Sequence, residues 1–289
     1  MISLVPHILV FLLALKAHKG KSLTPLGIAA SIITGLIHTS HPWIVYFLLL
    51  AGFYLSSSKF TKLKSDIKSQ LTIQIDAGKN DSTHQEQRTH IQVFANSIVA
   101  SILILLHRHF IHNDLLVIGI ISHYAAVTAD TWSSELGILS KSEPILITTL
   151  KKCPKGTNGG VSPLGLGVAL LAGIYISILS IVALKLQGIT ISALDGGICS
   201  HMKFIVFFGI IGLFGSLLDS LLGAVFQKSV VNEKGLILEA KGGGIVKGGK
   251  EDKSKIISGQ LNILSNNQVN LLMAFLTSLA GMGLWKVVS

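Results

Sequence analysis

The chain has 289 residues, of which 49% are hydrophobic and 13% are charged. Soluble domains carry about 25% charged residues, so this composition, with repeated long apolar runs, indicates a polytopic membrane protein rather than a soluble one. The formal net charge is +10. Because the basic residues lie between apolar segments, we expect them to set the topology and to meet anionic lipid headgroups, and we expect no nucleic-acid binding.

We expect residues 1–289 to form a single, all-α membrane domain with about eight transmembrane helices, since apolar segments of suitable length recur along the whole chain. The first segment has neither a basic start nor a small-x-small cleavage site, so it is interpreted as a span and not as a signal peptide. The expected segments are roughly 2–15, 23–40, 43–57, 92–107, 115–137, 161–184, 203–226 and 268–287.

Basic residues gather in every second connection, and by the positive-inside rule these connections face the cytosol, which puts the N-terminus outside or in a lumen. In a eukaryote the endoplasmic reticulum or another endomembrane would fit. The two cysteines then fall on opposite sides, so we expect no disulfide. The expected inside loops are 16–22, 58–91, 138–160 and 227–267.

Two stretches of these loops, 61–90 and 232–257, are polar or rich in glycine and lysine, and we expect both to be mobile without a ligand. A glycosylation sequon starts at Asn80, and its cytosolic position predicts that it is unused. Residues 244–250 read G-x-x-x-x-G-K, but Glu251 follows where a P-loop has Ser or Thr, so a flexible loop is the better interpretation.

The fifth apolar segment ends in the run ADTWSSELG at 129–137. His123, Asp130 and Ser134 share one helical face, and a polar stripe on an apolar span should face the bundle interior or a cavity. Asp130 is predicted to be functional, because a carboxylate in a membrane is costly; the alternative is that Asp130 and Ser134 only join helices by hydrogen bonds. Glu135 lies about 140° from Asp130 around an ideal helix, so it joins Asp130 only if the helix ends or unwinds there.

The seventh segment carries a second stripe, in which small and polar residues recur at every fourth position: Gly215, Asp219, Gly223 and Gln227. Small residues at this spacing let helices pack closely. Asp219 lies in the inner half of its segment, as Asp130 does, and two such carboxylates suit a shared Mg²⁺. We therefore expect Asp130, Asp219 and Glu135 to bind Mg²⁺; a structural pair of Asp219 with a lysine or asparagine is the alternative.

The loop 151–160 reads KKCPKGTNGG, and the helix that follows would aim its N-terminus at an anion. Glycines let a backbone approach phosphate closely and lysines add positive charge; an ordinary basic loop is the alternative. The expected phosphate-binding residues are Lys151, Lys152, Lys155, Gly156, Thr157, Asn158, Gly159, Gly160, Ser162 and Ser134. Amides near the segment ends would line a polar cavity or join helices: Asn96, Asn266, Asn267 and Asn270.

Four runs resemble the transmembrane protein nineteen family, which includes the plant phytyl-phosphate kinases: QVFAN at 92–96, ADTWSSELG at 129–137, KGTNGGVS at 155–162 and GSLLDSLLGA at 215–224. The resemblance extends from about residue 21 to residue 270. It implies a multi-pass membrane protein and, for the plant members, a kinase that converts a prenyl monophosphate into the diphosphate. A looser similarity to dolichol and phytol kinases, which use CTP, leaves CTP or ATP as the donor.

The residues suit this chemistry, since phosphoryl transfer needs positioning and charge neutralisation, and a prenyl monophosphate needs no general base. Asp130, Asp219 and Lys155 would then carry catalysis with Mg²⁺, and the prenyl tail would lie between the spans. Two alternatives remain. A secondary transporter also has intramembrane carboxylates, usually nearer the midplane, and a non-enzymatic lipid-binding membrane protein is the other.

Overall fold

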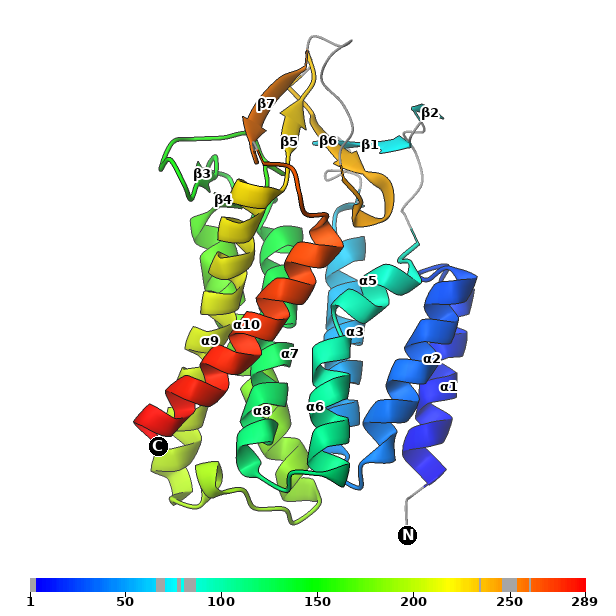
Figure 1. Ribbon diagram of the computed structural model, residues 1–289, viewed down its shortest axis with the longest axis vertical. Coiled ribbons are helices and arrows are strands. Elements are labelled where there is room, and N and C mark those ends of the chain that lie inside the picture. The colour runs from blue at the N-terminus through cyan, green and yellow to red at the C-terminus, as the bar shows by residue number, and fades with distance from the viewer. Residues whose placement is uncertain are drawn as a thin grey trace.

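The computed structural model describes residues 4–65, 71–76, 79–80, 87–233, 235–245, 254–259 and 261–289. Long helices stand side by side in a bundle, and small sheets cover one end of it (Figure 1). The helices are α1 (Leu4–Lys19), α2 (Pro25–Ser40), α3 (Val45–Lys62), α5 (His90–Ala95), α6 (Ile98–His109), α7 (Asp114–Gly137), α8 (Pro163–Leu186), α9 (Gly197–Phe226) and α10 (Asn266–Val288), with 3₁₀ turns η1 (Ser192–Leu194) and η2 (Lys241–Gly243).

Each expected apolar segment corresponds to helix, and the fourth is divided into α5 and α6 by a break at Asn96 and Ser97. Among the described residues, four helices are long and apolar enough to cross a membrane by length and composition: α7, α8, α9 and α10. Helices α2 and α6 are apolar but shorter. The described part of the chain is therefore mostly helical with four candidate spans, while the total of about eight spans stays a prediction.

The expectation of an all-α chain missed two small sheets. The larger has the order β2-β1-β6-β5-β7, in which β1 and β6 run parallel and the other neighbours antiparallel. Its strands come from loops far apart in the sequence, and such non-local pairing leaves no periodic signal in either loop. The strands are β1 (Thr72–Asp76), β2 (Lys79–Asn80), β5 (Ser229–Val231), β6 (Ile237–Ala240) and β7 (Lys255–Ser258), and in the smaller sheet β3 (Ile145–Leu146) and β4 (Gly160–Val161).

Within the two stretches expected to be mobile, strands β1, β2, β6 and part of β7 are paired in the larger sheet, while residues 61–62 belong to α3 and residues 241–243 to η2. Two of the sequence features singled out above include residues that the structure does not describe. Of the sequon, Asp81 and Ser82 lie outside it, and so do residues 246–251 of the glycine-lysine stretch.

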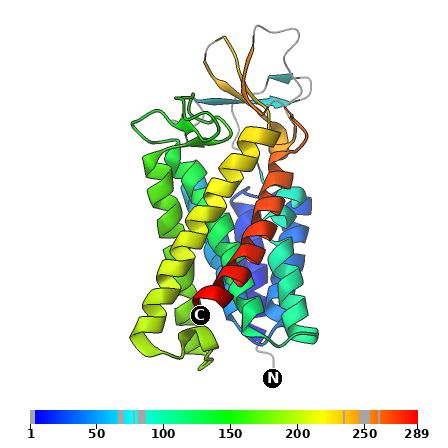
Figure 2. The same ribbon diagram turned by 60° about the vertical axis from the view of Figure 1, so that its left-hand side comes forward.

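The described parts of the four basic loops lie at the same end of the bundle as the sheets, and the start of α1 and the end of α10 lie at the opposite end (Figures 1 and 2). This grouping is the one that the alternation of charged loops requires. Which end faces the cytosol stays a prediction.

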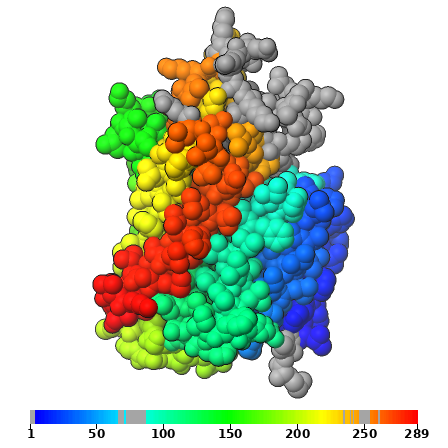
Figure 3. Space-filling view, viewed as in Figure 1, coloured from blue at the N-terminus to red at the C-terminus, as the bar shows by residue number. Residues whose placement is uncertain are grey.

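Helix α7 is the centre of the bundle, and all its residues from Val117 to Ala129 are buried. It contacts α3, α6, α8, α9 and α10, and α10 crosses one face of the bundle from the sheets to the C-terminus (Figure 3). The α7–α9 contact is close because Gly215 has no side chain: a Cβ there would lie 2.6 Å from Cβ of Ala126. The glycine stripe of α9 therefore brings Asp219 up to α7.

We predict that Gly215→Ala lowers the thermal stability of the protein in detergent, because the added methyl group overlaps Ala126 on α7. Overpacking of this kind costs about 1–3 kcal/mol of unfolding free energy. Gly283→Ala on α10 is the control, since a Cβ there meets nothing within 4 Å, and alanine favours helix over glycine. Equal melting temperatures for the Gly215 variant and the wild type would contradict the close α7–α9 contact.

Candidate functional site

A cavity of about 460 Å³ lies between the helices, near the end that the sheets cover. Its lining comes from α1, α2, α3, α5, α7, α8, α9, α10 and the α7–α8 loop. One half is polar and holds the expected carboxylates, asparagines and glycine loop, whereas the other half is mostly apolar and lies between α1, α2 and α3. The cavity therefore joins an ionic site to an apolar compartment.

Asp130 on α7 and Asp219 on α9 bring their carboxyl groups within hydrogen-bonding reach of each other in the polar half. The amide nitrogen of Asn270 on α10 lies 3.2 Å from Asp219 Oδ2 and 2.9 Å from the backbone oxygen of Asn266, in the side-chain orientation that satisfies the amide. Beside the pair, Ser133 Oγ and Ser216 Oγ lie 2.7 Å apart. Three helices thus hold the two carboxyl groups together.

Glu135 does not join this pair. The hydroxyl group of Thr61 donates to Glu135 Oε1 (2.8 Å), and Arg88 Nη2 donates to Thr61 Oγ1 (3.0 Å). Helix α7 stays helical to Gly137, so Glu135 faces Thr61 while it still lines the cavity. Binding of Mg²⁺ by all three carboxylates stays a prediction. Within the described ranges, no three His, Cys, Asp or Glu side chains come together as a metal site.

Two facing carboxylates still fit one metal ion. Mg²⁺ is commonly held by one or two carboxylates and completes its octahedron with water and substrate phosphate oxygens. The Asp130–Asp219 pair opens onto the cavity, where such ligands have room. Zn²⁺ in structural sites would need four protein ligands of the nitrogen and sulfur type, which this pair does not offer.

The glycine loop is pressed against α9 close to Asp219. Gly159 has φ of +83°, and a Cβ there would lie 2.4 Å from Cβ of Ala224. The N–H of Asn158 donates to Ser229 Oγ (2.9 Å), and Ser258 Oγ donates to the carbonyl of Asn158 (3.1 Å). The loop is thus fixed between α9 and the larger sheet.

The amides of this loop are mostly used within the protein. The N–H groups of Thr157 and Gly160 donate to Pro154 O (3.2 Å) and Thr157 O (2.9 Å), in addition to that of Asn158. Gly156, Thr157, Asn158, Gly159 and Gly160 all line the cavity, but the expected cradle of free amides is only partly available. Binding of a phosphate group would therefore depend more on a lysine side chain and on the N-terminus of α8 than on the amides of this loop.

Helix α8 begins at the cavity wall. Ser162 caps it by accepting from the N–H of Gly165 (3.1 Å), and its hydroxyl group also lies 3.3 Å from the carbonyl of Gly137, to which it donates. Pro163 occupies the first turn. The start of a helix carries partial positive charge and favours a phosphate group. The position of α8 is therefore compatible with the expected phosphate site at its N-terminus. Ser134 also lines the cavity, with its hydroxyl donating to Thr131 O.

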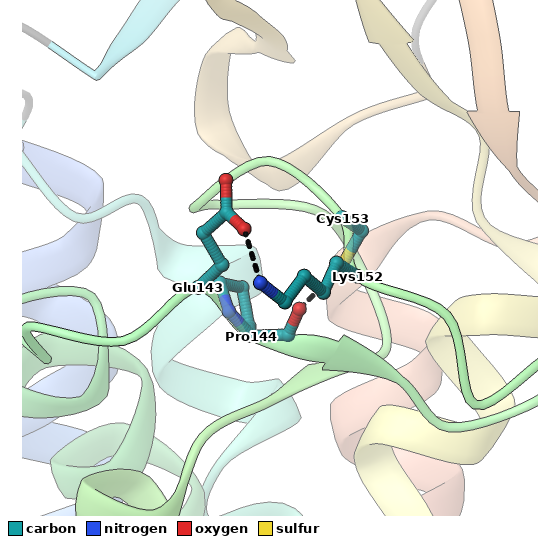
Figure 4. A network of polar contacts seen from close by, with 4 residues as sticks. All are labelled: Glu143, Pro144, Lys152 and Cys153. Carbon is teal, nitrogen blue, oxygen red and sulfur yellow. Dashed lines mark hydrogen bonds and ion pairs between the residues drawn. The ribbon is translucent and has the colours of Figure 1, made fainter.

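The three expected lysines separate in space. Lys155 lines the cavity and its Nζ donates to the carbonyl of Ser140. Lys152 is exposed and pairs with Glu143 Oε2 at 3.3 Å, beside the contact between Cys153 and Pro144 (Figure 4). Lys151 is also exposed, and neither it nor Lys152 lines the cavity. Lys155 is therefore the lysine of this loop that can reach a ligand.

Arg88 is a cavity residue that the sequence reasoning missed. It was one of several basic residues in a polar loop, with no pattern to distinguish it. Its backbone pairs with the α1–α2 connection through Ser22 O and Thr24 N, both at 3.0 Å. Burial lowers the pKa of its guanidinium group and the Glu135 charge opposes that shift, yet an arginine stays protonated.

The asparagines of the helix ends line the cavity and also join helices, so both interpretations hold together. Asn267 Nδ2 donates to the carbonyl of Gly242 (2.7 Å), which connects α10 to η2. The break between α5 and α6 leaves the carbonyl of Asn96 available, and His123 Nε2 lies 2.9 Å from it. His123 is fully buried, as expected of a hydrogen-bonded core residue.

Comparison with known proteins finds membrane proteins. The family model described as integral membrane protein DUF92 matches residues 8–278. Protein PGR of Arabidopsis thaliana is 36% identical over 286 residues, which cover 93% of this chain and 92% of that protein. An uncharacterized membrane protein of Methanocaldococcus jannaschii is 30% identical over 244 residues, or 84% of this chain and 91% of its own. No solved structure matches the chain significantly.

We predict that Mg²⁺ raises the melting temperature of the wild type and that Asp130→Asn and Asp219→Asn each remove this effect. A ligand that binds only the folded state stabilises it, and each variant removes one of the two facing carboxylates. Glu143→Gln, in which an exposed carboxylate is lost, should respond to Mg²⁺ as the wild type does. Persistence of the full shift in both aspartate variants would show that the pair is not the metal site.

Proposed function

The chain belongs to the integral membrane family DUF92, and we propose that this member is a Mg²⁺-dependent kinase. It would transfer a phosphoryl group from a nucleoside triphosphate to a prenyl monophosphate. The observation that supports this most is the cavity itself, in which a carboxylate pair, a lysine and a helix N-terminus adjoin an apolar compartment. A reaction between a charged, water-soluble donor and a lipid phosphate needs both environments at one place.

The position of the pair agrees with chemistry at a membrane boundary. Asp130 and Asp219 each lie seven residues before the ends of their helices, Gly137 and Phe226. At 1.5 Å per residue this is about 10 Å from the sheet-covered end. A nucleotide could reach this depth from water, whereas a transporter more often places its site near the midplane.

The protein groups have separate tasks in this reaction. Asp130 and Asp219 would hold Mg²⁺, which neutralises charge on the phosphoryl group during transfer. Lys155 and the start of α8 would bind the donor phosphates, which come from ATP or CTP. The acceptor phosphate is already ionised at neutral pH, so no side chain has to remove a proton from it. The surrounding helices would keep bulk water from the donor phosphates and so limit hydrolysis.

The direct test uses purified protein with Mg²⁺, labelled ATP or CTP, and a panel of prenols and prenyl monophosphates. Label should appear in a prenyl diphosphate with the wild type, and Asp130→Asn should abolish it while the protein remains folded. If no acceptor becomes labelled by folded wild-type protein, the kinase proposal fails. Flux of prenyl phosphate across liposomes containing the protein would then favour transport.

We predict that Lys155→Met raises the nucleotide KM and lowers kcat/KM by about 10- to 100-fold, the equivalent of one charge-assisted hydrogen bond of about 1.5–3 kcal/mol. Lys152→Met is the matched control, because this lysine is exposed and bound to Glu143. Its kinetics should equal those of the wild type. Equal losses in the two variants would indicate general loop electrostatics and would contradict the assigned role of Lys155.

A further inference from the structure

The apolar half of the cavity descends between α1, α2 and α3. Its lining includes Ala17, Ala14 and Val10 on α1 and Tyr54, Ala51 and Phe47 on α3. From Ala17 to Val10, and likewise from Tyr54 to Phe47, the wall spans seven residues, or about 10 Å at 1.5 Å per residue. The alanines among them, Ala14, Ala17 and Ala51, leave space between the two helices along this length.

The inner end of this compartment is closed by packed side chains. Val10 and Phe47 are the deepest lining residues on α1 and α3 within the described chain. Together with Ala51 they form a hydrophobic cluster, with exposed fractions of 4%, 3% and 8%. Helix α2 seals the side, since a Cβ on Gly35 would lie 2.7 Å from Val10 Cγ1. A chain that enters from the polar half therefore meets a definite end.

The upper end of the compartment carries a cation. Arg88 lines the cavity near Ala17, Leu23 and Tyr54, and its Nη2 is anchored on Thr61 at 3.0 Å. A guanidinium group has five N–H donors in a planar fork that suits phosphate oxygens. Backbone bonds to the α1–α2 connection fix the position of Arg88, so the charge is held at the border between polar and apolar lining.

We propose that this compartment binds the acceptor lipid, an isoprenoid monophosphate. Its tail lies between α1, α2 and α3, its phosphate is held by Arg88, and the cluster of Val10, Phe47 and Ala51 limits the tail length. The proposal rests on the proposed function for the fate of this phosphate. The donor side, with Lys155 and α8, and the acceptor side, with Arg88, then lie around the Asp130–Asp219 pair.

The cavity favours one narrow chain over a two-chain phospholipid. Its total volume is about 460 Å³, and this figure includes the polar half. Among the described residues that line this compartment, Arg88 is the cation at its upper end, with the Glu135 carboxylate also in the lining, and one arginine there suits a tail that carries one phosphate. The same geometry predicts that residues on the far side of α1, such as Leu12 and Leu15, do not contact the ligand, because both are exposed on the outer surface.

The test is photolabelling of the full-length protein in nanodiscs, without nucleotide, by a prenyl monophosphate that carries a diazirine at its tail end. Label should map to Val10 and Ala14 on α1 and to Phe47 and Ala51 on α3, which line the cavity. Ala51→Phe should weaken binding of long tails and spare short ones, whereas Phe47→Ala should admit longer tails. Leu55→Phe, on the exposed side of α3, is the matched control and should leave the length preference unchanged.

The Arg88→Gln variant separates the contribution of the phosphate group to binding from that of the tail. It should weaken binding of the monophosphate roughly 10- to 100-fold and leave binding of the corresponding prenol unchanged. Equal weakening of both ligands would overturn the role of Arg88. Label confined to outer residues such as Leu12, or full competition by phosphatidic acid, would overturn the lipid site.

The labelling and the turnover measurements test the lipid site and the proposed kinase separately. Label on the α1–α3 wall, with no phosphoryl transfer by the wild type, supports the lipid site and contradicts the proposed kinase. Phosphoryl transfer with label found only on the outer surface supports the kinase and contradicts this lipid site.

Discussion

The structure depends on two carboxyl groups that face each other inside a helix bundle. Like charges at this distance repel strongly where little water is present, so the pair needs a cation, a shared proton or hydrogen-bond donors to be stable. Asn270 supplies one donor, and the close α7–α9 contact at Gly215 fixes the distance. Carboxylates inside a membrane are costly and commonly mark functional sites, which is why the pair is the centre of the proposed function.

The other elements of the site are held in place around this pair. The larger sheet and α9 fix the glycine loop, so that Lys155 and the start of α8 reach the cavity from one side. The α1–α2 connection fixes Arg88, which reaches the cavity from another side. The apolar compartment lies below Arg88, and the loops that reach water lie above the pair. In the proposed reaction, a soluble donor and a lipid acceptor would meet at the pair without either leaving its own environment.

Much of this arrangement could be predicted from residues whose presence in an apolar segment is costly. Asp130, Asp219 and the glycine stripe of α9 stand out by helical periodicity, and the structure brings the two aspartates together. Periodicity could not show that α7 stays helical through Glu135, which turns that carboxylate towards Thr61. It also could not separate Lys155 from Lys152 in a loop, or find strands that pair between distant loops, because these depend on tertiary contacts. Arg88 could not be recognised as a cavity residue from the sequence, because its position also depends on tertiary contacts.

Electron paramagnetic resonance with Mn²⁺ in place of Mg²⁺ tests the central claim most directly. We expect one bound Mn²⁺ with phosphorus hyperfine coupling from a non-hydrolysable nucleotide. Addition of prenyl monophosphate should alter this coupling, and both effects should be lost in Asp130→Asn. The control is Glu143→Gln, which should give the wild-type spectrum. Nucleotide coupling that persists unchanged in Asp130→Asn would contradict a metal-phosphate site at the Asp130–Asp219 pair, and the proposed reaction with it.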